Sequence, residues 1–165
     1  MVQAAKPLVV ITGVSGYIGC HIASLFVKDG GFTVRGTVRN LEKPHILSNQ
    51  IQIVKADLED PPSLDSAIQG ATYVVHTATP VLFDTTPEKV INPAVNGTIS
   101  VLKAAQKHKV KRVVLTSTVA AASQYTEEVE CTEECWGDVD KMREDEDLQP
   151  YYLGKVLAEK GAWEF

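Results

Sequence analysis

The sequence predicts an α/β protein in which helices cover a doubly wound, parallel β-sheet. Five short apolar segments alternate with longer segments whose apolar residues recur at helical spacing. Strands that alternate with helices are typical of parallel sheets with right-handed crossovers. The first apolar segment runs into a turn with three glycines, in the stretch PLVVITGVSGYIG. Because 165 residues are enough for one core, we expect a single domain over residues 1–165.

The first half of the chain is expected to contain three strands and two helices. An apolar run predicts a strand at 8–11, and helical spacing predicts a helix over 17–28. The alternating, valine- and threonine-rich stretch 32–39 predicts the second strand, and 51–55 a short third strand. Two prolines begin a brief helix at 61–68, which a glycine ends.

The second half continues the alternation. A fourth strand is expected at 72–77, and a proline at the first helical position indicates a helix from about 86 to 108, kinked at Pro93. Residues 113–117 predict the fifth strand. The acidic stretch up to Asp147 is expected to be a long loop, and 149–165 a final helix in which the chain stops.

Composition and charge exclude several classes of protein. No apolar run approaches the roughly 20 residues of a membrane span, and the first one is too short for a signal peptide, so we expect a cytoplasmic protein. Residues 126–147 carry eleven acids against Lys141 and Arg143, which leaves the rest of the chain mildly basic within a net charge of −5. That remainder suits an anionic cofactor but is too weak and scattered for nucleic acid.

The three cysteines do not indicate a disulfide framework or a metal site. An odd number of cysteines favours a reducing compartment. Cys131 and Cys135 lie four residues apart, which is not the spacing of a zinc pair, and no histidine is near them in the sequence. We therefore expect no bound metal.

The three glycines of the first turn predict a site for a dinucleotide. Gly13 lets the backbone turn off the strand, Gly16 lets a pyrophosphate approach the main chain, and Gly19 lets the new helix pack closely against the strand it left. The N–H groups and dipole of that helix start favour a phosphate. The alternative, a turn that merely connects strand to helix, is disfavoured by the apolar strand before the glycines and the amphipathic helix after them.

The end of the second strand predicts which dinucleotide binds. An acid at this position would bind the ribose of NAD, but the sequence has Arg39, with Lys43 shortly after. A guanidinium can hold a 2′-phosphate with two hydrogen bonds. We therefore expect NADP(H) rather than NAD(H), with a solvated surface arginine as the alternative.

The last helix carries a candidate catalytic pair. Tyr151 and Lys155 lie four residues apart, so both side chains project from one helix face. A nearby ammonium favours the phenolate, which makes Tyr151 a candidate general acid near neutral pH. The pattern alone is weak, because a surface tyrosine with a solvated lysine has the same spacing. The hydroxyls of the Thr116-Ser117-Thr118 run, at the end of the fifth strand, could bind a substrate carbonyl.

This order of glycine turn, strand-end hydroxyl and Tyr-x-x-x-Lys resembles the short-chain dehydrogenase/reductase superfamily, whose cofactor domain is of the Rossmann type. The spacing of TGVSGYIG is similar to that of the extended, epimerase-like branch. Further motifs along the whole chain resemble the dihydroflavonol reductase and cinnamoyl-CoA reductase group: TVRN, DLED, HTATPV, NGT, VVLTST, ECWGDVD and YYLGKVLAEKGAW.

The resemblance implies a role for each matching residue. Residues that would line the pyrophosphate are Gly13, Gly16, Tyr17, Ile18 and Gly19. Those that would bind the rest of the cofactor are Arg39 and Lys43 at the 2′-phosphate, Asp57 and Leu58 at the adenine, and Thr77, Ala78 and Thr79 near the nicotinamide ribose. Thr118 matches the catalytic hydroxyl, with Ser117 a close competitor, and Lys155 would also bind the ribose. Tyr151 would protonate the alkoxide that forms as NADPH reduces an aldehyde or ketone.

Members of that group are about twice as long as this chain, and the further half supplies a sixth strand and the substrate lobe. We therefore expect a truncated Rossmann-type domain that binds the cofactor with little turnover. The expected partner is a small-molecule carbonyl compound, with no nucleic acid, no membrane and a possible homodimer. Two alternatives stay open: an NAD-dependent nucleotide-sugar epimerase or dehydratase, and a non-catalytic dinucleotide-sensing protein.

Overall fold

The computed structural model describes residues 5–43, 45–82, 85–123, 130–145 and 148–165. The chain divides into two compact units. The first comprises Met1–Ala78 and Ser100–Thr116, and the second comprises Thr79–Ile99 and Ser117–Phe165. The single domain expected over the whole chain stays a prediction.

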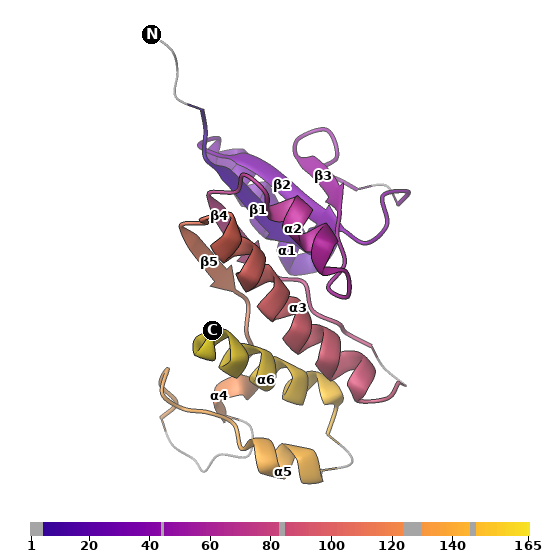
Figure 1. The fold of residues 1–165 in the computed structure, drawn as a ribbon, viewed down its shortest axis with the longest axis vertical. Helices are drawn as coiled ribbons and strands as arrows, with labels where there is room; N and C mark the ends of the chain where they lie inside the picture. Colours follow the sequence, from indigo (N-terminus) through magenta and orange to yellow (C-terminus); the bar gives the residue numbers. More distant parts are fainter. Residues whose placement is uncertain (1–4, 44, 83–84, 124–129, 146–147) are drawn as a thin grey trace. The chain divides into compact units, whose positions relative to one another are not determined.

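The first unit contains a five-stranded parallel sheet with the order β3-β2-β1-β4-β5 (Figure 1). Its strands are β1 (Leu8–Thr12), β2 (Thr33–Val38), β3 (Gln52–Lys55), β4 (Tyr73–His76) and β5 (Arg112–Leu115). After β3 the chain crosses to the other side of β1, so the strand order reverses between β1 and β4. The expected doubly wound parallel sheet is confirmed, and ligands bind such sheets at this reversal, beyond the carboxyl ends of the strands.

Helices cover both faces of this sheet because the side chains of β1 alternate between two apolar clusters. Val9 and Ile11 pack with Ala23 of α1 (Tyr17–Asp29) on one face. Val10 packs with Leu64 of α2 (Pro61–Ile68) and Val101 of α3 (Glu88–Lys107) on the other. The three helices α1, α2 and α3 were therefore expected in the right places, with bounds that differ from the expected ones by at most two residues.

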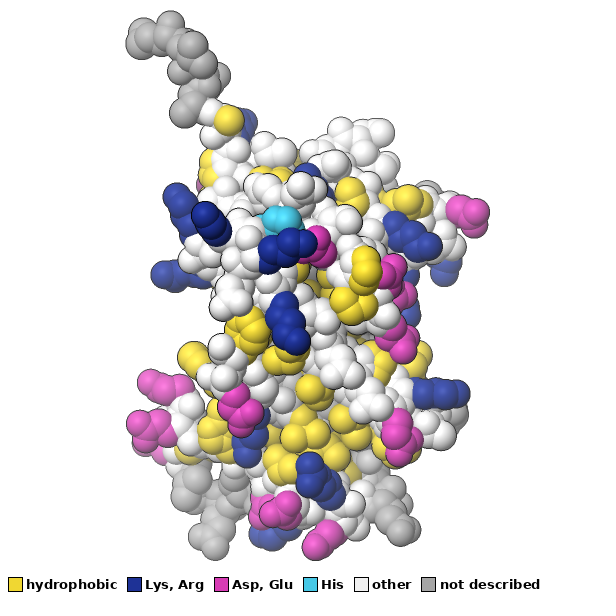
Figure 2. Space-filling model, in the orientation of Figure 1, with side chains coloured by type: hydrophobic (Ala, Val, Ile, Leu, Met, Phe, Trp, Pro, Cys, Tyr) yellow, Lys and Arg dark blue, Asp and Glu magenta, His cyan; other side chains and the backbone are white. Residues whose placement is uncertain are grey.

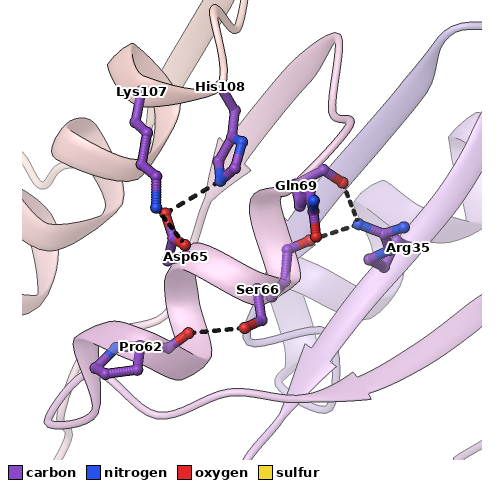
Figure 3. A network of polar contacts seen from close by, with 8 residues as sticks. Arg35, Pro62, Asp65, Ser66, Gln69, Lys107 and His108 are labelled. Atoms are coloured by element: carbon purple, nitrogen blue, oxygen red, sulfur yellow. Dashed lines mark hydrogen bonds and ion pairs between the residues drawn. The ribbon is translucent and has the colours of Figure 1, made fainter.

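Polar side chains also hold α2 in place (Figure 3). Arg35 of β2 donates through Nη1 to the carbonyls of Ala67 and Gln69 at the end of α2, over 2.7 and 2.8 Å. Asp65 of α2 pairs with Lys107 Nζ at 2.8 Å and with His108 Nε2 at 3.1 Å. These contacts join α2 to the sheet and to the end of α3.

The second unit packs short helices around α6 (Pro150–Glu164). Its core joins Met142 of α5 (Val139–Glu144) and Ala121 of α4 (Ala120–Ser123) to the α6 residues Leu153 and Val156. On the face drawn in Figure 2, hydrophobic side chains gather over the helices of this unit.

The long acidic loop expected before the last helix is a wrong prediction in part. Residues 139–144 form α5, because the Asp138 carboxylate accepts the N–H groups of Asp140 and Lys141 and so caps the helix. Met142 then anchors the helix in the core. Met142 is the buried residue of α5, with Val139 packed against the same cluster, and the acidic residues around them concealed this apolar face. Part of the expected loop, residues 124–129 and 146–147, lies outside the described residues.

Candidate functional site

The glycine turn after β1 is built around a backbone conformation that favours glycine. Gly13 has a φ of +69°, in the left-handed region. A Cβ on Gly13 would also lie 3.0 Å from the Cα of Ala78. The turn is attached to β2, because Gly13 N–H donates to Thr37 Oγ1 over 3.2 Å and Val14 N–H donates to the Thr37 carbonyl over 3.1 Å. The sharp turn expected at Gly13 is therefore present.

The other two glycines differ in what surrounds them. A Cβ on Gly16 would meet one atom, the Gly13 carbonyl oxygen at 3.3 Å, so the main chain there is open to a ligand. A Cβ on Gly19 would lie 2.5 Å from that oxygen and 2.9 Å from Thr77 Oγ1. Gly19 thus lets α1 pack on the turn itself and on the residue after β4. We had expected the close contact to be with β1.

The start of α1 is open to an anion. Gly16 is the N-cap residue, no side chain caps the helix, and its first turn contains no acid. Its first residue, Tyr17, is 82% exposed, and Ile18 is 51% exposed. N–H groups and a helix dipole without a side-chain partner favour a phosphate at this position.

The carboxyl ends of β2 and β3 present the residues expected to recognise the adenosine half of the cofactor. Arg39 directly follows β2, and its exposed side chain makes no hydrogen bond or ion pair with the described part of the chain. Lys43 is exposed as well. Asp57 lies two residues beyond β3, which pairs with β2 in parallel, so Asp57 lies at the same sheet edge as Arg39. Leu58 packs against the apolar cluster that contains Val10 and Leu64.

A buried polar cluster at the ends of β1 and β4 is the main feature that the sequence reasoning missed. Thr12 Oγ1 lies 2.7 Å from His76 Nδ1 and accepts the N–H groups of Thr77 and Ala78, each over 3.1 Å. Thr77 Oγ1 donates to the Thr12 carbonyl over 2.6 Å. The Thr77 hydroxyl therefore bonds within the protein. The available signal was a polar residue at the end of each of two apolar strands.

The candidate catalytic residues all belong to the second unit, together with Thr79. Tyr151 and Lys155 lie in the first two turns of α6, as expected. The Lys155 side chain is buried, with 7% exposed. Burial lowers the pKa of Lys155, and the Glu159 carboxylate opposes this shift to a smaller extent. Tyr151 is partly exposed, and its hydroxyl makes no hydrogen bond with the described residues.

The two competing hydroxyls after β5 have different partners. Ser117 Oγ donates to the Glu159 carboxylate of α6, so its proton is already used. The Thr118 side chain makes no hydrogen bond within the described ranges, and no bond joins it to Tyr151. These contacts support Thr118 over Ser117 as the hydroxyl for a substrate. Glu159 itself was missed, although its position four residues after Lys155 was a visible signal.

Neither a metal-binding cluster nor a membrane-spanning helix occurs among the described residues. No three His, Cys, Asp or Glu side chains gather there in a way that could hold a metal ion. None of the helices in the described ranges is both long and apolar enough to cross a bilayer.

Comparisons with known proteins agree with these features. The model of the NAD dependent epimerase/dehydratase family matches residues 9–165. Cinnamoyl-CoA reductase 1 of Arabidopsis thaliana is 40% identical over 99% of this chain and 50% of its own length. Dihydroflavonol 4-reductase of Dianthus caryophyllus is 35% identical over 95% of this chain and 47% of its own length. The chain thus spans about half the length of these relatives.

A solved structure shows the same fold. Yeast methylglyoxal/isovaleraldehyde reductase Gre2, complexed with NADPH, has a TM-score of 0.83 and 30% identity over 95% of this chain and 52% of its own. The resemblance to extended short-chain reductases of the dihydroflavonol and cinnamoyl-CoA type is confirmed by these matches.

Proposed function

The chain belongs to the NAD dependent epimerase/dehydratase family, and from this membership we propose that it is the cofactor-binding part of an NADPH-dependent reductase. The protein would transfer a hydride to the carbonyl carbon of an aldehyde or ketone. The observation that carries the proposal is the exposed Arg39 at the end of β2, which pairs with none of the described residues and lies at the same sheet edge as an open glycine turn. A guanidinium at this position suits a 2′-phosphate.

The residues of the first unit fit this cofactor. The N–H groups at the start of α1 would hold the pyrophosphate, with Gly16 providing the room for it. Arg39 and Lys43 would bind the 2′-phosphate, and Asp57 with Leu58 would contact the adenine. NADPH, when bound, supplies the hydride. Its presence in the Gre2 structure supports the expectation of NADP(H) for this chain.

The second unit would supply the proton and orient the carbonyl. Tyr151 would donate its phenolic proton to the developing alkoxide, and Thr118 would hydrogen-bond the carbonyl oxygen. The Lys155 ammonium would stabilise the phenolate that forms when this proton leaves. Burial of Lys155 strengthens such an effect, because charges interact more strongly away from water. Lys155 and Thr79 would also bind the nicotinamide ribose.

Several finer expectations belong to this proposal. They are one domain over residues 1–165, a cytoplasmic location, a possible homodimer and a small carbonyl compound as substrate. With half the length of its relatives, the 165-residue chain is expected to bind NADPH with little turnover. Steady NADPH oxidation by this chain with an aldehyde would contradict that expectation.

One alternative has an observation in its favour, since the matching family is named for epimerases and dehydratases. Such an enzyme would use NAD, and Arg39 opposes it. Fluorescence titration with NADPH and NADH separates the two proposals. We expect NADPH to bind at least about tenfold more tightly, and Arg39→Ala to abolish most of that difference while it leaves NADH affinity unchanged. Equal affinity of the wild-type protein for both would refute the reductase proposal in this form.

The catalytic assignment needs a separate test, in a form of the protein that reduces an aldehyde with NADPH. Tyr151→Phe keeps the ring and removes the proton donor, so turnover should fall by about 100-fold or more while NADPH affinity is kept. Tyr152→Phe, in the neighbouring position of α6, is the matched control and should keep turnover. Full activity of the Tyr151 variant would show that the assignment is wrong.

A further inference from the structure

The Thr12 hydroxyl at the end of β1 has three polar partners. It lies 2.7 Å from His76 Nδ1 and 3.1 Å from each of the backbone nitrogens of Thr77 and Ala78. Thr12 and His76 are only 1% and 2% exposed, and the two residues lie side by side in the parallel register of β1 and β4. The cluster is thus a built part of the sheet end and not a surface contact.

A count of donors and acceptors determines the protonation of His76. A hydroxyl has one proton to donate and two lone pairs with which to accept. The backbone N–H groups of Thr77 and Ala78 can only donate, so they occupy both lone pairs of Thr12 Oγ1. The proton of Thr12 must therefore point at His76 Nδ1, which has to be unprotonated. The imidazole is neutral, with its proton on Nε2.

The two residues held by Thr12 are also the ones that limit the glycine turn. The Ala78 Cα lies where a Gly13 side chain would approach to 3.0 Å, and Thr77 Oγ1 lies 2.9 Å from the Cβ position of Gly19. Thr77 and Ala78 thus pack against the first and third glycines. A shift of these two residues would move the turn that carries the proposed pyrophosphate site.

We propose that His76, as the neutral tautomer with its proton on Nε2, is a positioning residue for the cofactor site. It orients the Thr12 hydroxyl, which holds the backbone of Thr77 and Ala78 against the glycine turn. This inference rests on the proposed function for the identity of the ligand, NADPH. His76 itself contacts neither substrate nor cofactor in this role.

Two variants of His76 separate positioning from packing. His76→Leu keeps an apolar volume but removes the acceptor, and NADPH affinity should fall by about tenfold or more. His76→Asn places an amide oxygen close to the position of Nδ1, and it should restore affinity to within about threefold of the wild type. His108→Leu is the matched control, because it removes an imidazole bonded to Asp65 in the same unit. It should lower the unfolding midpoint without changing NADPH affinity.

Nuclear magnetic resonance tests the inference without any cofactor. Long-range ¹H–¹⁵N spectra of the wild-type protein should show His76 with an unprotonated Nδ1. The Thr77 and Ala78 amide resonances should shift in His76→Leu and return in His76→Asn. The spectrum of the wild-type protein tests the proposed tautomer even if His76→Leu does not fold. It also separates the two proposals: if the wild-type protein fails to bind NADPH, the proposed function fails, and the amide shifts still report on His76.

Three results would overturn the inference. One is a proton on Nδ1 of His76 in the wild-type protein. Another is a folded His76→Leu variant that binds NADPH as tightly as the wild type. The last is a folded His76→Asn variant that is as weak as His76→Leu, because the acceptor would then have no effect.

Discussion

Replacement of Gly19 by alanine tests the packing of α1 on the glycine turn. The added Cβ would lie 2.5 Å from the Gly13 carbonyl oxygen and 2.9 Å from Thr77 Oγ1. The oxygen belongs to the backbone, and its residue is itself packed on Ala78 and bonded to Thr37. Ordinary contact would require the Cβ and the oxygen to be about 0.9 Å further apart. The helix or the turn must therefore shift.

Two opposing effects set the size of the stability change that Gly19→Ala causes. Overpacking a rigid site costs about 1–3 kcal/mol, and two contacts this short place Gly19 near the upper end. Alanine is favoured over glycine inside a helix by about 1 kcal/mol. We therefore expect Gly19→Ala to lower the free energy of unfolding by roughly 2 kcal/mol.

Urea unfolding followed by far-UV circular dichroism measures this change. Gly161→Ala in α6 is the matched control, because its Cβ would meet Ile99 Cδ1 at 3.6 Å, an ordinary contact. Helix propensity should then dominate, and the free energy of unfolding of the control should rise by up to about 1 kcal/mol. A Gly19→Ala protein as stable as the wild type, or more stable, would refute the reasoning, because propensity would outweigh the clash.

Three further predictions follow from the same structure. In Gly16→Ala the added Cβ would meet one atom at 3.3 Å, so the free energy of unfolding should change by less than about 1 kcal/mol. Calorimetry should nevertheless show that NADPH affinity falls by about tenfold or more. Unchanged affinity would argue against a pyrophosphate at this turn. Lys107 and His108 hold the pKa of Asp65 below its usual value, so its pairing stabilises the fold above about pH 4 and is lost as the pH falls through the lowered pKa. The wild type should therefore be more stable than Asp65→Asn at pH 6, with a difference that disappears in acid; a difference that persists at pH 2 would contradict this. Glu159 raises the pKa of Lys155 against the larger effect of burial, so Glu159→Gln, which keeps an acceptor for Ser117, should lower that pKa. In the pH–rate profile of NADPH-dependent aldehyde reduction, the alkaline limb should then move to lower pH. An unmoved limb would show that the Glu159 charge does not affect the protonation of Lys155 during turnover.

The fold was largely predictable because its signals are local. Apolar runs, helical periodicity and glycine or proline stops lie within a few residues of the elements they determine. α5 was missed because its signals, the Asp138 cap and the apolar residues Val139 and Met142, lay among acidic residues typical of a loop. Strand ends were less predictable, and β5 ends at Leu115, two residues before the expected end.

The candidate site was predictable only in its motifs. The three glycines, Arg39, Tyr151 and Lys155 stand out in the sequence because residue type and spacing along one strand or helix suggest their chemistry. Their partners do not stand out in this way. Thr37, which holds the turn, and Glu159, which bonds Ser117, are ordinary residues whose importance lies in what they contact.

The sequence by itself therefore determined the parallel α/β fold, the dinucleotide turn and the kind of dinucleotide to expect. The tertiary structure alone decided which hydroxyl after β5 is engaged, what Gly19 packs against and which groups surround the Thr12 hydroxyl. The physical reason is separation along the chain. Thr12 and His76 are 64 residues apart, and Ser117 and Glu159 are 42 apart. Hydrogen bonds over such separations exist only after strand register and helix packing have brought the atoms within 3 Å or so.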